Sequence, residues 1–103
     1  MLTEKKEYLK RYLLQEAKIL RYKQMAQMDK QLEKFYTEKI IASQKLRKEI
    51  ENKINVIDNE LLVELLYQKY ILGKTLDEIS IILNYSKRHI ERLHVKALEK
   101  IDI

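Results

Sequence analysis

The chain has 103 residues and a formal net charge of +5, with one glycine, no proline and no cysteine. The shortage of turn-forming residues excludes a β-rich fold, and the absence of cysteine excludes disulfides and thiolate metal sites. No apolar run reaches the ~18 residues of a membrane span, and the N-terminus lacks the apolar centre of a signal peptide. We therefore expect an all-helical cytoplasmic protein that does not contact membranes.

Charge and composition divide the chain into two parts. Residues 1–56 contain 14 Lys and Arg against 8 Asp and Glu, whereas residues 57–103 contain 7 against 8. Glycine is confined to the second part. We expect a helical dimerisation or interaction region over residues 1–57 and a second domain over residues 58–103.

Residues 3–56 are rich in helix-forming Lys, Glu, Gln and Leu. Their apolar residues form three stripes that do not share one heptad register. The stripes are Leu9, Leu13, Ala17 and Leu20; Met28, Leu32, Phe35 and Tyr36; and Leu46, Ile50, Ile54 and Ile57. We favour two helices, roughly 3–27 and 30–56, with Asp29 as a cap. They would form an antiparallel hairpin or pack against a partner chain.

A continuous helix of ~50 residues is the alternative for this region. It would be ~75 Å long and could not bury its own stripes. Both arrangements favour self-association, so we expect a homodimer formed through the N-terminal helices.

The second part begins with a predicted helix of its own. Asp58 precedes an apolar run and is expected to cap its N-terminus. The run repeats at helical spacing, and Gly73 ends it because glycine adopts the left-handed conformation freely. Its apolar positions are Leu62, Leu65, Leu66 and Tyr70.

Two further helices follow, each with its own N-terminal signal. Thr75 and Glu78 form the capping-box pattern, Asn84 suits a left-handed turn, and Ser86 is expected to cap the last helix. The apolar positions are Leu76, Ile79, Ile82 and Leu83 in the first helix, and Ile90, Leu93, Ala97, Leu98 and Ile101 in the second.

A short helix, a tight turn and a second helix form the arrangement of a DNA-binding helix-turn-helix, whose second helix enters the major groove. The spacing from Thr75 to Ser86 fits one short helix and a turn. Lysine and arginine donate to guanine O6 and N7, and glutamate accepts from cytosine N4. The exposed side of the last helix offers such groups at Lys87, Arg88, Glu91 and Arg92.

The same residues carry a family resemblance. Thr75 to Ser80, with Ser86, Ile90, Leu93, Ala97, Leu98 and Ile101, resemble region 4 of bacterial sigma-70 factors. The chain is more closely similar to phage and prophage regulators of the ArpU and RinA type, which have a region 4-like C-terminus. That similarity lies in Tyr70, Ile71, Lys74, Thr75, Ile79, Asn84 to Ser86, Arg88, His89, Arg92 to His94, Ala97 and Leu98.

The resemblance implies a sequence-specific transcription regulator acting on double-stranded DNA in a bacterial host cell. By position, it places Lys87, Arg88, Glu91 and Arg92 at the bases. It places Thr75, Ser86, His89 and Lys96 near the phosphates.

Other functions have less support in the sequence. No phosphate-binding loop, nucleophile elbow or paired-carboxylate cleft is visible, and the two histidines lack further metal ligands, so we expect no enzyme activity, cofactor or metal. The tyrosines of the N-terminal part are expected to pack rather than stack on bases. The alternative is a module that binds RNA polymerase or a sigma factor without contacting DNA, which the slight negative charge of residues 57–103 motivates. A structural coiled-coil protein is a third possibility.

Overall fold

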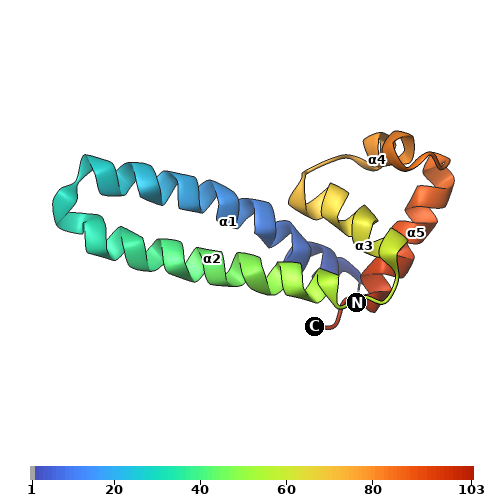
Figure 1. Cartoon of the computed structure of the whole chain (residues 1–103), viewed down its shortest axis with the longest axis horizontal. Coiled ribbons are helices and arrows are strands. Elements are labelled where there is room, and N and C mark those ends of the chain that lie inside the picture. The colour runs from blue at the N-terminus through green and yellow to red at the C-terminus, as the bar shows by residue number, and fades with distance from the viewer. Residues whose placement is uncertain (1) are drawn as a thin grey trace.

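The computed structural model describes residues 2–103, and its first half is an antiparallel helical hairpin (Figure 1). Helix α1 (Leu2–Met28) and helix α2 (Glu33–Asn55) are joined by Asp29 and a short 3-10 turn, η1 (Lys30–Leu32). The Asp29 side chain accepts a hydrogen bond from the backbone N–H of Gln31 at 3.1 Å, as a cap does. The hairpin and the cap at Asp29 are thus confirmed, and a continuous helix is excluded.

Polar contacts join the two hairpin helices along the side of α1 that faces α2. The hydroxyl of Tyr8 donates to Glu49 at 2.8 Å, and that of Tyr12 donates to Glu51 at 2.9 Å. Further along, Tyr22 and Tyr36 stack with their ring centroids 6.0 Å apart. These tyrosines therefore pack within the hairpin, as expected for amphipathic side chains.

The second half contains three short helices at the open end of the hairpin, while the tip at Asp29 projects away from them (Figure 1). Helix α3 (Glu60–Leu66) continues into a π-helical turn, η2 (Tyr67–Ile71). Asn59 caps α3 by accepting from the N–H of Leu62 at 3.1 Å, so the expectation that Asp58 is the cap was wrong by one residue. Asn59 has the extended backbone that a cap requires. Gly73 follows with φ +73°, as its left-handed role predicts.

Helices α4 (Leu76–Leu83) and α5 (Lys87–Lys100) begin and end where the sequence signals stand. The capping box between Thr75 and Glu78 is complete. Asn84 ends α4 in the left-handed conformation with φ 59°. Ser86 caps α5 through its hydroxyl, which accepts from the N–H of His89 at 3.1 Å.

One hydrophobic core links the hairpin to the C-terminal helices. Residues of α1 and α2, together with Ile57, pack against residues of α3, η2 and the C-terminal part of α5. Its buried members are Leu9, Tyr12, Ile50, Ile54, Ile57, Leu62, Leu66, Tyr70, Ala97, Leu98 and Ile101. The hairpin and the C-terminal helices therefore share this core. A smaller cluster of Leu65, Ile79 and Ile90 packs α4 against α3 and α5.

Several apolar residues that we expected to be buried are exposed. The buried face of α1 contains Leu9, Tyr12 and Ile19, because the position of α2 determines which side is covered; Leu13 and Leu20 are exposed. In the second stripe only Tyr36 is partly covered. Met28, Leu32 and Phe35 are exposed at the hairpin tip, as is Ile82 on α4, which we expected to face inward.

The stripe from Leu46 to Ile57 is covered as expected. Among residues 2–103, no helix combines the length and the apolar character needed to cross a membrane.

Candidate nucleic-acid interface

The rotation of α5 determines which of its side chains are available to a ligand. Its inner face buries Ile90, Ala97 and Leu98 completely. His94 also points inward, where its Nε2 lies 2.7 Å from the hydroxyl of Tyr70 in η2. Because the inner face is fixed by apolar packing and this hydrogen bond, the opposite face of α5 is directed to solvent.

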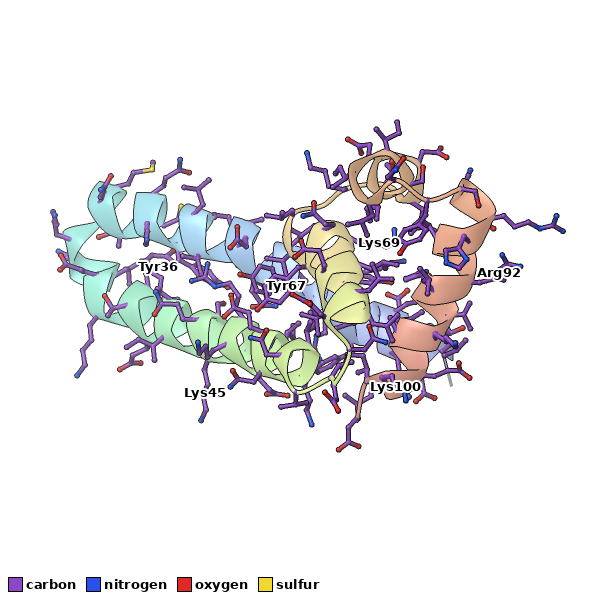
Figure 2. The ribbon with its side chains drawn as sticks, turned by 45° about the vertical axis from the view of Figure 1, so that its right-hand side comes forward. Tyr36, Lys45, Tyr67, Lys69, Arg92 and Lys100 are labelled. Carbon is purple, nitrogen blue, oxygen red and sulfur yellow. The ribbon has the colours of Figure 1, made fainter. Side chains whose placement is uncertain are left out.

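That outer face presents a row of positive charges. Arg88, Arg92 and Lys96 follow one another at intervals of four residues, so their side chains share one side of the helix. All three are exposed. Arg92 points away from α3 and from the hairpin (Figure 2). Among residues 2–103, no carboxylate forms an ion pair with any of the three, so their charge remains available to an anionic partner.

Lys87 differs from these three residues. Its Nζ lies 3.2 Å from Oδ1 of Asp77 in α4, and both side chains are more than half exposed. An exposed pair of this kind contributes about 0–1 kcal/mol, so Lys87 can exchange Asp77 for a stronger anionic partner at little cost. Glu91 is exposed beside this row and is in none of the ion pairs among residues 2–103.

Some of the residues expected near phosphates already make hydrogen bonds or ring contacts within the protein. Thr75 and Ser86 use their hydroxyl oxygens to cap α4 and α5, accepting from the N–H groups of Glu78 and His89. The backbone N–H of Thr75 donates to the Glu78 carboxylate at 3.0 Å, which lowers the pKa of Glu78. The ring of His89 lies against that of Tyr85, with centroids 4.9 Å apart. The turn before α5 is thus held by the Ser86 cap and the Tyr85–His89 contact, and Ser86, Lys87, Arg88 and His89 lie together where α5 begins.

Three residues that were not predicted from the sequence lie at or next to the outer face of α5. Val95 is 44% exposed on the outer side of α5, and its spacing of three from Arg92 would have revealed it. Tyr85 is partly exposed beside His89. Asp77 had no sequence signal as a partner of Lys87, because that contact depends on how α4 and α5 cross.

Within residues 2–103, no group of three His, Asp or Glu side chains is arranged to hold a metal ion. No protein family model matches the chain, and no curated protein or solved structure is significantly similar to it.

Proposed function

We propose that α4, the Asn84 turn and α5 form a helix-turn-helix of the sigma-70 region 4 type. The protein would be a sequence-specific DNA-binding transcription regulator, encoded by a phage or prophage, whose helix α5 enters the major groove. The observation that supports this most strongly is the outer face of α5. It presents Arg88, Arg92 and Lys96 in one row, and no carboxylate of residues 2–103 forms an ion pair with them, on a helix whose inner face is buried.

The chemistry of these side chains suits DNA. Arg88 and Arg92 each offer the planar fork that binds guanine O6 and N7 in a bidentate manner, and Glu91 can accept from cytosine N4. Lys87 would leave Asp77 to contact a base. Lys96, with Thr75, Ser86 and His89, would lie near the phosphates, where each Lys or Arg contact makes the affinity depend on salt.

The hairpin would make the protein a homodimer. Between residues 20 and 42, all of which the structure describes, no side chain is buried. The exposed side chains include large apolar ones: Leu20 is 62% exposed and Phe35 is 50% exposed. A two-helix tip without a core gains stability when a second hairpin covers it, as in a four-helix bundle. A two-fold dimer would also present two copies of α5 to two half-sites.

The direct test is binding to the promoter regions next to the protein's own gene, by mobility shift and footprinting. We expect the wild-type protein to protect a defined site. Arg88→Ala should lose about 1–3 kcal/mol of binding free energy at that site and relax specificity at one position. Arg47→Ala is the matched control, because Arg47 lies on the hairpin, where it pairs with Glu16 at 2.9 Å. The absence of a protected site in all these regions would contradict the proposal.

A second function is favoured by the Lys87–Asp77 ion pair and by the seven basic against eight acidic residues of positions 57–103. In this alternative, the same unit binds RNA polymerase or a sigma factor without contacting DNA. Capture of purified polymerase by a protein that gives no DNA shift would decide for it.

A further inference from the structure

Three lysines gather where α1 passes η2. Lys6 and Lys10 are four residues apart on one side of α1, and Lys69 belongs to η2. Leu13 continues that side of α1 and approaches Gly73, which follows η2: a Cβ added to Gly73 would lie 3.5 Å from Cδ1 of Leu13. We call Lys6, Lys10 and Lys69 the α1–η2 lysine cluster.

The mutual repulsion of these lysines is only partly offset by a carboxylate. Burial, and then the positive charges of Lys10 and Lys6, lowers the pKa of Lys69. Glu7 pairs with Lys10 at 3.5 Å, and both of these side chains are more than half exposed. Among residues 2–103, neither Lys6 nor Lys69 forms an ion pair. The cluster therefore keeps a positive charge that a bound anion would stabilise.

Lys69 connects this cluster to α5. Its Nζ lies 5.6 Å from the centre of the Tyr70 ring, and the hydroxyl of Tyr70 lies 2.7 Å from Nε2 of His94. The pKa of His94 is lowered to about 4 by burial first, and then by the charges of Lys69 and Lys6. Both lysines are thus close enough to α5 for their charge to act on it.

Helix α1 borders one particular side of α5. Nζ of Lys5 donates to the backbone carbonyl of Glu99 at 3.2 Å, and Glu99 is four residues after Val95, so α1 lies on the Val95 side. Val95 and Lys96 are three and four residues after Arg92, which places them on opposite sides of Arg92 around the helix. The lysine cluster and Lys96 therefore lie on opposite sides of the basic row.

This arrangement matches the two backbones that border a groove. The major groove of DNA is about 12 Å wide, so a helix inserted into it has phosphates on both sides. Lys96 would supply a positive charge on one side of α5. We propose that the α1–η2 lysine cluster binds the DNA backbone on the other side, where Lys6 and Lys69 each donate to a phosphate oxygen. The inference rests on the proposed function, since it requires α5 to lie in the groove.

The salt dependence of DNA binding tests this contact. Each lysine that no longer reaches a phosphate makes the slope of log affinity against log salt shallower by about 0.9. Fluorescence anisotropy of the full chain is measured with two short duplexes, one from the promoter region next to the protein's own gene and one of random sequence. Lys6→Gln, Lys69→Gln should bind both duplexes at least about tenfold more weakly at ~0.1 M salt, with slopes shallower by about 2.

The matched control is the double variant Lys45→Gln, Lys48→Gln, which removes the same charge from exposed positions of α2. Lys45 points away from α5 (Figure 2), so this variant should keep the wild-type slope. Lys6 is exposed. Lys6→Gln alone should therefore melt close to the wild-type temperature and still lose about 0.9 of the slope, which separates a lost contact from a lost fold.

An unchanged slope in Lys6→Gln and in the Lys6, Lys69 double variant would overturn the proposal, because the anion on the cluster would then not be DNA. An equal change in the Lys45, Lys48 control would also overturn it, because the effect would come from net charge alone.

The two proposals fail separately. Equal affinity for the two duplexes, with a shallower slope in the Lys6, Lys69 double variant, would retain the phosphate contact and remove sequence-specific recognition. A preference for the promoter duplex with an unchanged slope in that variant would do the reverse. A protein that binds neither duplex would overturn both.

Discussion

The hydroxyl of Tyr70 lies 2.7 Å from Nε2 of His94, in the core that joins η2 to α5. Burial is the main reason why the pKa of His94 falls from 6.5 to about 4, and the positive charges of Lys69 and Lys6 lower it further. Burial also raises the pKa of Tyr70 to about 12. Both groups are therefore neutral near pH 7, and their hydrogen bond holds the inner face of α5 in place.

This pair predicts acid sensitivity. Because the folded-state pKa of His94 lies below 6.5, its value in the unfolded chain, the unfolded chain takes up the proton first. The stability contributed by neutral His94 is complete above pH 6.5 and is lost as the pH falls towards 4. Urea unfolding should give a free energy of unfolding about 2 kcal/mol lower at pH 5 than at pH 7.

His94→Phe should be less stable at pH 7, because it leaves the Tyr70 hydroxyl without its partner. Its stability should then change less between pH 7 and pH 5. His89→Gln is the control, since His89 lies near the surface, and it should keep the wild-type slope. If His94→Phe kept that slope, the account of His94 would be wrong.

The cap of α3 gives a second prediction. Asp58 and Asn59 are neighbours and both are residue types that cap helices, but only Asn59 is positioned to do so. Asn59 accepts from the N–H of Leu62, whereas the side chain of Asp58 caps nothing in the helix. Asn59→Ala should lower the free energy of unfolding by about 1 kcal/mol, and Asp58→Ala should change it by less than about 0.5 kcal/mol. Urea titration of both variants measures the difference. Equal losses would contradict the assignment of the cap.

The hairpin tip gives a third prediction. The protein should sediment with about twice its chain mass of 12.5 kDa. The double variant Leu20→Ser, Phe35→Ser should sediment as a monomer, because it removes two exposed apolar contacts of about 1.5–3 kcal/mol each when buried. Val56→Ser is the control: Val56 is 74% exposed at the base of the hairpin, away from the tip, and this variant should remain dimeric. A monomeric wild-type protein at micromolar concentration would exclude dimerisation through the tip.

Local signals explain which parts of the structure could be predicted from the sequence. The Thr75–Glu78 capping box, the Ser86 cap and the left-handed Asn84 involve side chains and backbone a few residues apart, so their residue types alone indicate them. The bend at Asp29 is of the same kind. These signals predicted both ends of α4 and the start of α5.

The remaining features depend on contacts between distant segments. Which side of α1 is buried depends on how α2 crosses it, so Tyr12 and Ile19 are covered although Leu13 and Leu20 fit the apolar stripe equally well. The Lys87–Asp77 pair depends in the same way on how α5 sits against α4. Within the candidate site, the row on α5 follows from helical spacing. That no carboxylate of residues 2–103 pairs with this row could be seen only in the structure.

The central claim is that the outer face of α5 recognises a DNA sequence, and selection from a pool of random double-stranded DNA tests it most directly. The wild-type protein should enrich one motif. Arg92→Ala should enrich a motif relaxed at one position, because the lost contact is worth about 1–3 kcal/mol of discrimination. Lys96→Gln should enrich the wild-type motif with an overall weaker, less salt-dependent affinity, as expected for a phosphate contact. A pool that stays random after selection with the wild-type protein would contradict the claim.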